Sequence, residues 1–113
     1  MKYNKYGAKK TIINGITFAS KAEAKRYENL QWEAAAKIIK NLIIQPVFTI
    51  HKGEKYQIKY KADFQYEFEG KTIIEDVKGV ITPVFKLKKK LFEDNLGAKE
   101  IRKGNKKLIT WEV

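Results

Sequence analysis

The chain has 113 residues, enough for one compact domain, and has no cysteine, which excludes disulfides, thiol catalysis and thiolate zinc sites. Lysine and arginine number 24 against 13 aspartate and glutamate residues, so the net charge of +11 attracts polyanions, and nucleic acid is the first candidate partner. No run reaches the ~18 consecutive apolar residues of a membrane span, and no helix combines a basic face with a long apolar face, so a membrane partner ranks low.

The chain begins with a basic segment and a predicted β-hairpin. Residues 1–10 are polar and basic, and we expect them to form a loose arm. Two short β-type runs in residues 11–18 flank Asn14 and Gly15. Both of these residues tolerate the positive φ angles of a type I′ turn, so the pattern predicts a tight hairpin.

Residues 20–42 form the longest helix candidate. Ser20 is a suitable N-cap, and Glu23 three residues later completes a capping-box pattern. The apolar residues at helical spacing, which we expect to face the core, are Tyr27, Leu30, Ala34 and Ile38.

Three strands are predicted next. Residues 43–51 read as a strand in which Pro46 requires an edge or a bulge, because proline cannot donate to a sheet. Residues 56–69 alternate strictly between apolar and polar side chains, as expected for one strand with a buried face. A turn at Gly70 leads into residues 72–78, which we expect to pair with that strand in the antiparallel sense.

The last third predicts a helix and two short strands. Thr82 can cap a helix over residues 82–97, and Pro83 suits its first turn because the missing N–H has no partner there. Segments 99–102 and 107–112 resemble short strands. The residues expected on the inward side of the helix are Val84, Leu87 and Leu91. The element order predicts one mixed α/β domain, of the α+β type, spanning residues 1–113.

Charged residues inside the apolar strand 72–78 are the most informative feature. Alternation places Asp76 and Lys78 on one face and Glu75 on the other, where we expect a surface acid or one paired with a helix. Asp63 lies on the polar face of the preceding strand. Glu23 leads the inward stripe of the first helix and is the third acid; Glu28 is the reserve candidate.

This set of side chains suits metal-assisted chemistry on phosphate esters. Carboxylate oxygens suit Mg²⁺, which typically takes one or two of them together with waters and a substrate phosphate. A bound metal can acidify a water and polarise a phosphoryl oxygen. A neighbouring lysine can orient that water or stabilise the charge that develops on the phosphate.

Asp63, followed after twelve residues by the phrase DVK at 76–78, resembles the D-(x)n-(D/E)-x-K signature of the PD-(D/E)xK nuclease superfamily. A helix carrying an acid before these strands, and a helix after them, match its restriction-endonuclease-like αβββαβ core. The phrases FASKAEAKRYENL, QP, YKADFQY, IEDVKG and FKLKKKLFE resemble small phage-encoded proteins of that superfamily, related to Holliday junction resolvase-like endonucleases. This narrower resemblance covers residues 11 to about 94. Ala62 replaces the proline of the family name.

The resemblance implies a mixed sheet flanked by helices and a Mg²⁺-dependent DNA endonuclease, with Mn²⁺ as a substitute metal. Glu23, Asp63 and Asp76 would hold the metal, and Lys78 would be the catalytic lysine. It also implies a phage protein that acts in the host cytoplasm. Because so short a chain has little material for reading base sequence, we expect selectivity for branched or junction DNA, which is compatible with a homodimer.

Five lysines are predicted to contact the DNA backbone. Two of them share the strand face of Asp63, and three lie on the helix that follows the Lys78 strand. Against phosphates they would add affinity that depends on salt and not on sequence. They are Lys59, Lys61, Lys86, Lys89 and Lys90.

Simpler roles stay open for each candidate residue. Glu23 can be only the capping-box partner of Ser20, and Asp63 an acid on a solvated strand face. Asp76 and Lys78 can be a structural pair. For the whole chain, the alternatives are a non-catalytic DNA-binding module on a nuclease-like fold and a protein-interaction subunit such as a nuclease inhibitor.

Overall fold

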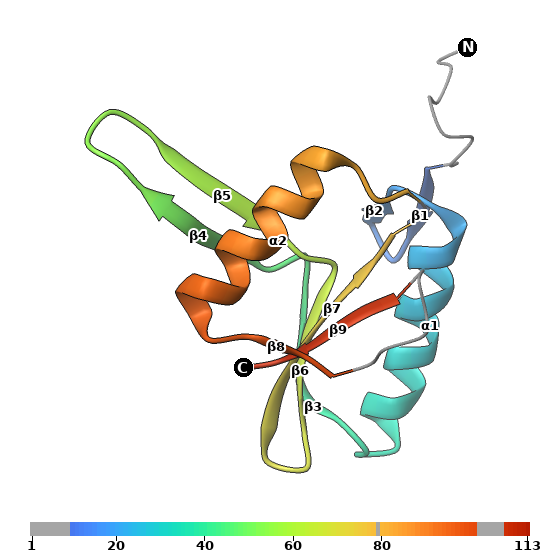
Figure 1. The fold of residues 1–113 in the computed structure, drawn as a ribbon. Helices are drawn as coiled ribbons and strands as arrows, with labels where there is room; N and C mark the ends of the chain where they lie inside the picture. The colour runs from blue at the N-terminus through green and yellow to red at the C-terminus, as the bar shows by residue number, and fades with distance from the viewer. Residues whose placement is uncertain (1–9, 79, 102–107) are drawn as a thin grey trace.

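The computed structural model describes residues 10–78, 80–101 and 108–113 (Figure 1). Residues 1–9, which belong to the predicted basic arm, Gly79 and residues 102–107 lie outside the described residues. In chain order the elements are β1 (Thr11–Ile13), β2 (Ile16–Phe18), α1 (Lys21–Ala35), β3 (Lys40–Ile44), β4 (Val47–Lys52), β5 (Gln57–Lys61), β6 (Phe64–Phe68), β7 (Lys71–Val77), α2 (Pro83–Leu96), β8 (Lys99–Glu100) and β9 (Leu108–Glu112).

A five-stranded sheet in the order β3-β6-β7-β9-β8 forms the centre of the fold. Helix α1 covers one face and α2 lies toward the other (Figure 1). Strand β7 is buried from both sides: Ile73 packs in the α1 cluster and Ile74 in the α2 cluster. This double burial explains why two consecutive residues of β7, Ile73 and Ile74, are both apolar although their side chains point to opposite faces. The predicted α+β class is confirmed.

The sheet differs from the expected mixed sheet because every hydrogen-bonded pair in it is antiparallel. After α2 the chain forms the edge strand β8, which pairs antiparallel with β9. Strand β9 therefore joins the sheet beside β7 in the opposite direction. The separate hairpin β1–β2 turns at Asn14 and Gly15 with φ values of 52° and 76°, which confirms the predicted turn.

Helix α1 begins as predicted and ends earlier than predicted. The Ser20 Oγ accepts a hydrogen bond from the Glu23 N–H at 3.2 Å. The helix ends at Ala35, and Lys37 takes a φ of 61°, which redirects the chain into β3. Ile38 consequently lies 54% exposed instead of continuing the buried stripe that Tyr27 and Leu30 form.

Two segments predicted as single strands are each divided in two. The first breaks between β3 and β4, where Gln45 has a φ of 54° and Pro46 follows. The second breaks between β5 and β6 at Ala62 and Asp63. Strands β4 and β5 thereby leave the central sheet and form a two-stranded sheet of their own. The break places Asp63 directly before the start of β6, beside the C-terminal end of β7.

Helix α2 has the predicted bounds but a different inward face. The Thr82 Oγ1 accepts a hydrogen bond from the Phe85 N–H at 3.1 Å, as expected for an N-cap. Phe85 and Phe92 are buried, whereas Val84 and Leu87 are exposed. The prediction that Val84 and Leu87 face inward is therefore wrong, because the larger phenylalanine rings face the sheet. None of the described helices is long and apolar enough to cross a membrane.

Candidate active site

The four candidate residues come from three elements that meet at one end of the sheet. Glu23 lies in the first turn of α1, Asp63 precedes β6, and Asp76 and Lys78 lie at the end of β7. The Asp63 N–H donates to the Glu75 carbonyl oxygen at 3.1 Å, which holds Asp63 alongside β7. The antiparallel pairing of β6 with β7 thus brings together two acids, Asp63 and Asp76, that are separated by twelve intervening residues in the chain.

Asp63 is held against both β7 and α1. Its Oδ2 accepts a hydrogen bond from the Val77 N–H at 2.6 Å. Its carboxyl group also interacts electrostatically with that of Glu23. Burial, together with the negative charge of Glu23, raises the pKa of Asp63 to about 7, although the Val77 N–H acts in the opposite direction. Below about pH 7, Asp63 therefore keeps its proton, because a second negative charge beside Glu23 is unfavourable in this buried position.

Asp76 is almost completely buried, with 1% of its surface exposed. The Tyr60 hydroxyl donates a short hydrogen bond to its Oδ2, and the Lys78 Nζ lies 3.0 Å from the same oxygen. Burial raises the pKa of Asp76 to about 6, against the opposing effect of Lys78 and with a further contribution from the charge of Glu23. Glu23, Asp63 and Asp76 therefore form one electrostatic group.

Lys78 is fixed by contacts on two sides. Its Nζ forms an ion pair with Asp76 and lies 4.4 Å from the centroid of the Phe85 ring, at the start of α2. A cation over an aromatic face is stabilised by the ring quadrupole. The ammonium group is thus placed beside the acids by β7 and α2 together, as alternation along β7 predicted.

Glu23 takes part in the cap of α1 and lies at the site at the same time, but its carboxyl group bonds to the residue before the N-cap and not to the Ser20 N–H of the predicted capping box. Its Oε2 accepts a hydrogen bond from the Ala19 N–H at 3.0 Å, and its own N–H donates to Ser20. The charge of the same carboxyl group acts on Asp63 and raises its pKa. The cap therefore holds Glu23 at the site instead of turning it away.

The donor chemistry fits a hard divalent cation held by two carboxylates. Across the described part of the chain, no three His, Cys, Asp or Glu side chains are already arranged around one ion position. Glu23 and Asp63 interact electrostatically, while one oxygen of Asp76 accepts a hydrogen bond from Tyr60 and forms an ion pair with Lys78. One or two carboxylates are what Mg²⁺ typically takes from a protein. A cation between Glu23 and Asp63 would also relieve the repulsion that raises the pKa of Asp63.

The predicted DNA-contacting lysines separate into two groups. Lys59, Lys61, Lys86 and Lys90 are exposed. Lys89 is less available for binding phosphate, because its Nζ forms ion pairs with Glu93 Oε2 at 2.9 Å and with Glu100 Oε1 at 3.5 Å. We therefore remove Lys89 from the predicted DNA contacts.

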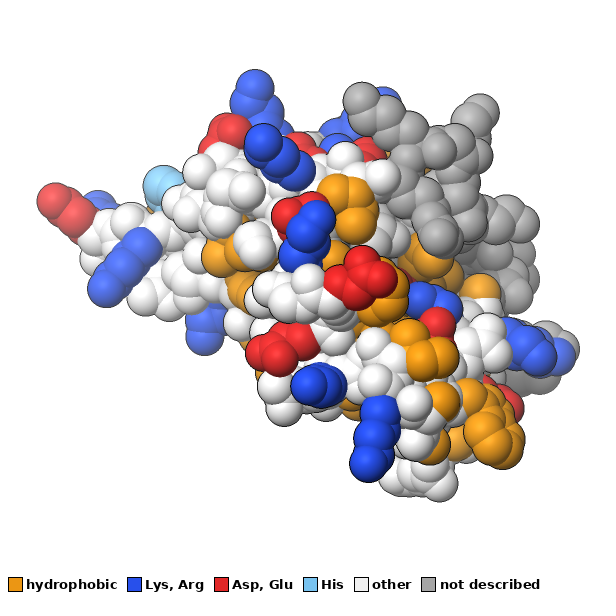
Figure 2. Space-filling view, turned by 90° about the horizontal axis from the view of Figure 1, so that it is seen from below, with side chains coloured by type: hydrophobic (Ala, Val, Ile, Leu, Met, Phe, Trp, Pro, Cys, Tyr) orange, Lys and Arg blue, Asp and Glu red, His pale blue; other side chains and the backbone are white. Residues whose placement is uncertain are grey.

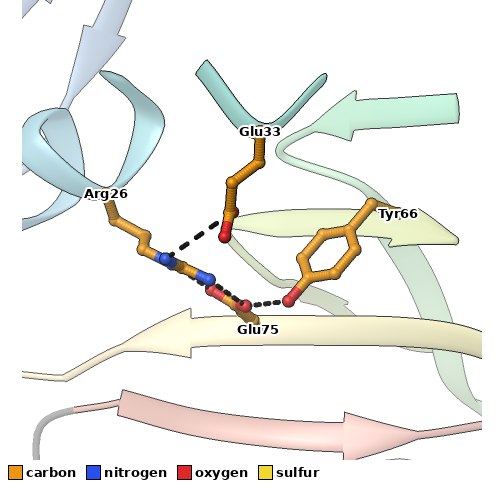
Figure 3. Close-up of polar contacts among 4 residues, drawn as sticks. All are labelled: Arg26, Glu33, Tyr66 and Glu75. Atoms are coloured by element: carbon orange, nitrogen blue, oxygen red, sulfur yellow. Dashed lines mark hydrogen bonds and ion pairs between the residues drawn. The ribbon is translucent and has the colours of Figure 1, made fainter. Parts of the chain in front are cut away.

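Glu75 lies on the opposite face of β7, as alternation predicted, and is paired with α1 instead of lying at the surface. It is 1% exposed and accepts two hydrogen bonds of 2.7 Å from Arg26, as well as a short one from the Tyr66 hydroxyl (Figure 3). The hydrogen bond to Glu75 raises the pKa of Arg26. Glu33 lies 4.0 Å from Arg26 on the same side (Figure 3).

This ion pair has a structural consequence for the site. Arg26 lies one helical turn after Glu23, and Glu75 directly precedes Asp76. The pair therefore fixes the first turn of α1 against the strand that carries Asp76. A cavity of about 330 Å³ opens beside Arg26 and Glu75, with the apolar side chains of Ile39, Phe68, Ile73 and Ile101 in its lining.

Tyr60 and Arg26 are the two site residues that sequence reasoning missed. Alternation assigns Tyr60 to the buried face of its strand, and its ring does pack there. Nothing in the pattern marks its hydroxyl as a partner of Asp76. Arg26 is 49 residues from Glu75 in the chain, so only the placement of α1 on the sheet reveals the pair.

The fold and the site define a small α+β protein with a buried group of carboxylates and a lysine at one end of its central sheet. The chain belongs to the family described as protein of unknown function (DUF1064), whose profile matches residues 3–108. No curated protein and no solved structure is significantly similar to it.

The raised pKa of Asp63 predicts that stability falls as the pH rises from about 4 to about 7. In this window the folded protein keeps a proton on Asp63 that the unfolded chain has released, so rising pH favours unfolding. Asp63→Asn should flatten this slope and make the protein more stable than wild type at pH 8. Urea unfolding at pH 5 and pH 8 measures both values. Asp94→Asn, at an exposed acid on α2, is the control and should retain the wild-type slope. An unchanged slope in Asp63→Asn would contradict the prediction.

Proposed function

We propose that this protein is a metal-dependent DNA endonuclease that hydrolyses phosphodiester bonds, with branched or junction DNA as its preferred substrate. The observation that carries the proposal is the convergence of Glu23, Asp63, Asp76 and Lys78 at one end of the sheet. These residues come from separate segments, and burying unneeded carboxylates beside one another is unfavourable. Clusters of groups with raised pKa values occur preferentially at functional sites.

Each side chain has a distinct role in this proposal. Glu23 and Asp63 would hold Mg²⁺, with Asp76 completing the negative site. The bound metal would supply Lewis acidity toward the phosphate and an acidified water. Lys78, held by Asp76 and the Phe85 ring, would stabilise the negative charge that develops on the phosphate.

Tyr60 and Arg26 would act through the acids. The Tyr60 hydroxyl fixes the orientation of the Asp76 carboxylate. Arg26 fixes α1, and with it Glu23, against β7. Rigid support of this kind matters because catalytic groups lose efficiency when they are displaced by as little as ~1 Å.

The positive surface supports DNA as the substrate. The net charge is +11, and exposed lysines lie on β5 and α2, the two elements that adjoin the site. Lys59 and Lys61 precede Asp63, and Lys86 and Lys90 follow Lys78. A phosphate backbone lying across the site would meet lysines on both sides.

The test is a cleavage assay with labelled four-way junctions and linear duplexes of the same sequence, in Mg²⁺, in Mn²⁺ and in EDTA. Wild-type protein should cut the junction faster than the duplex, only with metal, and Asp76→Ala should be inactive. Salt-sensitive DNA binding without cleavage in either metal would instead favour a non-catalytic DNA-binding module. Equal cleavage by wild type and Asp76→Ala would identify a contaminating nuclease and overturn the proposal.

A further inference from the structure

The hairpin formed by β4 and β5 projects from the body of the protein beyond α2 (Figure 1). Its root is firmly packed: Ile50 and Tyr60 are buried, and the Phe48 ring meets the Phe92 ring of α2 edge-on at 5.2 Å. The Asn95 side chain of α2 also donates to the Ile50 carbonyl oxygen at 2.8 Å. The hairpin therefore has a fixed direction relative to the site.

The hairpin is strongly basic along its whole length. Four exposed lysines are opposed by a single acid, Glu54. The lysines are Lys52, Lys55, Lys59 and Lys61. Within the described part of the chain, none of them forms an ion pair of 4.0 Å or less, whereas Lys89 on the neighbouring helix forms two. Figure 2 shows lysine or arginine side chains on more than one side of this projection. Their charge is therefore free to meet an external polyanion.

The root of the hairpin is part of the candidate active site. Tyr60 on β5 donates to Asp76, and Asp63 follows the end of β5 by two residues. An extended strand advances about 3.3 Å per residue, so the seven steps along the chain from Tyr56 at the tip to Asp63 span at most about 23 Å. Duplex DNA rises about 3.4 Å per base pair, so this length corresponds to about seven base pairs.

We propose that the β4–β5 hairpin is an arm that follows the phosphate backbone of a DNA duplex for about seven base pairs away from the cleavage position. This inference rests on the proposed function for the position of the DNA. A two-stranded ribbon is narrow enough for the major groove of duplex DNA. Lysines along it would contact phosphates, which fix the register of the protein on a duplex without reading its sequence.

The test compares two double variants that remove the same charge. Lys52→Gln/Lys55→Gln alters the outer part of the hairpin. Lys40→Gln/Lys99→Gln alters exposed lysines on β3 and β8 at the end of the sheet opposite Asp76, as the strand register shows. Fluorescence anisotropy in EDTA measures the Kd of each protein for a labelled duplex from low to high salt.

The hairpin variant should reduce the slope of log Kd against log salt by about 1.8, since each lost phosphate contact removes about 0.9. The control variant should change it by less than about 0.5 on the same scale. Shortening the duplex by about seven base pairs on one side should weaken wild-type binding and leave the hairpin variant little changed. Equal salt slopes for the two variants would contradict the proposal that the hairpin binds the DNA backbone.

The outcomes also separate this inference from the proposed function. If the wild type cleaves DNA and the two variants have equal salt slopes, the proposed endonuclease function is supported and the proposed DNA-binding role of the hairpin is wrong. If the hairpin variant has a reduced salt slope but the wild type does not cleave DNA, the hairpin binds DNA and the proposed endonuclease function is wrong. If the hairpin variant lost affinity for phosphatidylserine vesicles and kept its affinity for DNA, the hairpin would be assigned to a lipid surface, and the inference would be wrong.

Discussion

Replacing Lys78 with methionine is expected to slow DNA cleavage at saturating substrate by about 10²- to 10³-fold, the usual effect of removing one group that stabilises transition-state charge. The ammonium group lies 3.0 Å from Asp76 and 4.4 Å from the centroid of the Phe85 ring, and these two contacts hold its positive charge beside the acids. Methionine keeps most of the aliphatic volume and removes the charge. Single-turnover cleavage in Mg²⁺ gives the rate.

The same variant should bind DNA almost as well as wild type in Ca²⁺, because one phosphate contact among several is a small part of the affinity. A matched control is Lys40→Met, which removes an exposed lysine at the other end of the sheet and should cleave at the wild-type rate. A Lys78→Met rate within about fivefold of wild type, a loss of under 1 kcal/mol of transition-state stabilisation, would show that this lysine has no role in the chemistry.

Replacing Arg26 with alanine is expected to lower the free energy of unfolding by about 3–5 kcal/mol, as is typical when one partner of a buried ion pair is removed. Glu75 is 1% exposed, so among the described residues its side chain would keep Tyr66 alone as a hydrogen-bond donor. The double variant Arg26→Met/Glu75→Leu should recover most of the loss, because an apolar pair of similar volume can replace a buried ion pair. Urea unfolding at pH 7 measures all three proteins.

An exposed ion pair provides the comparison for this effect. Lys71 and Glu112 lie 3.6 Å apart with side chains that are 58% and 38% exposed. Exposed pairs of this kind contribute about 0–1 kcal/mol, so Lys71→Ala should change the stability little. If Arg26→Ala lowered the free energy of unfolding as little as Lys71→Ala does, the Arg26–Glu75 pair would not be the contact that holds α1 on the sheet.

The part of the site that follows from local patterns was predictable from the sequence. Alternation along β7 separates Asp76 and Lys78 from Glu75, and the structure places them on opposite faces. The capping pattern at Ser20 fixes where α1 begins and so where Glu23 lies. These features depend on residues within one strand or one helical turn, which is the range over which periodicity and caps operate.

What depends on packing between elements was not predictable. The break at Asp63 lies within a perfectly alternating segment, and only the departure of the β4–β5 hairpin from the central sheet creates it. The inward face of α2 was misassigned because Val84 and Leu87 match helical spacing as well as Phe85 and Phe92 do. The direction of β9 is set by the chain path through β8, which periodicity does not describe.

The central claim is that Glu23 and Asp63 form a metal site. The most direct measurement is a titration of Mn²⁺ into DNA-free protein, followed by electron paramagnetic resonance of the free ion. Wild type should bind Mn²⁺, and Glu23→Gln/Asp63→Asn should not, while Glu28→Gln/Asp94→Asn, at two exposed acids, should bind as wild type does. Absence of Mn²⁺ binding by folded wild-type protein, or undiminished binding by Glu23→Gln/Asp63→Asn, would contradict the claim.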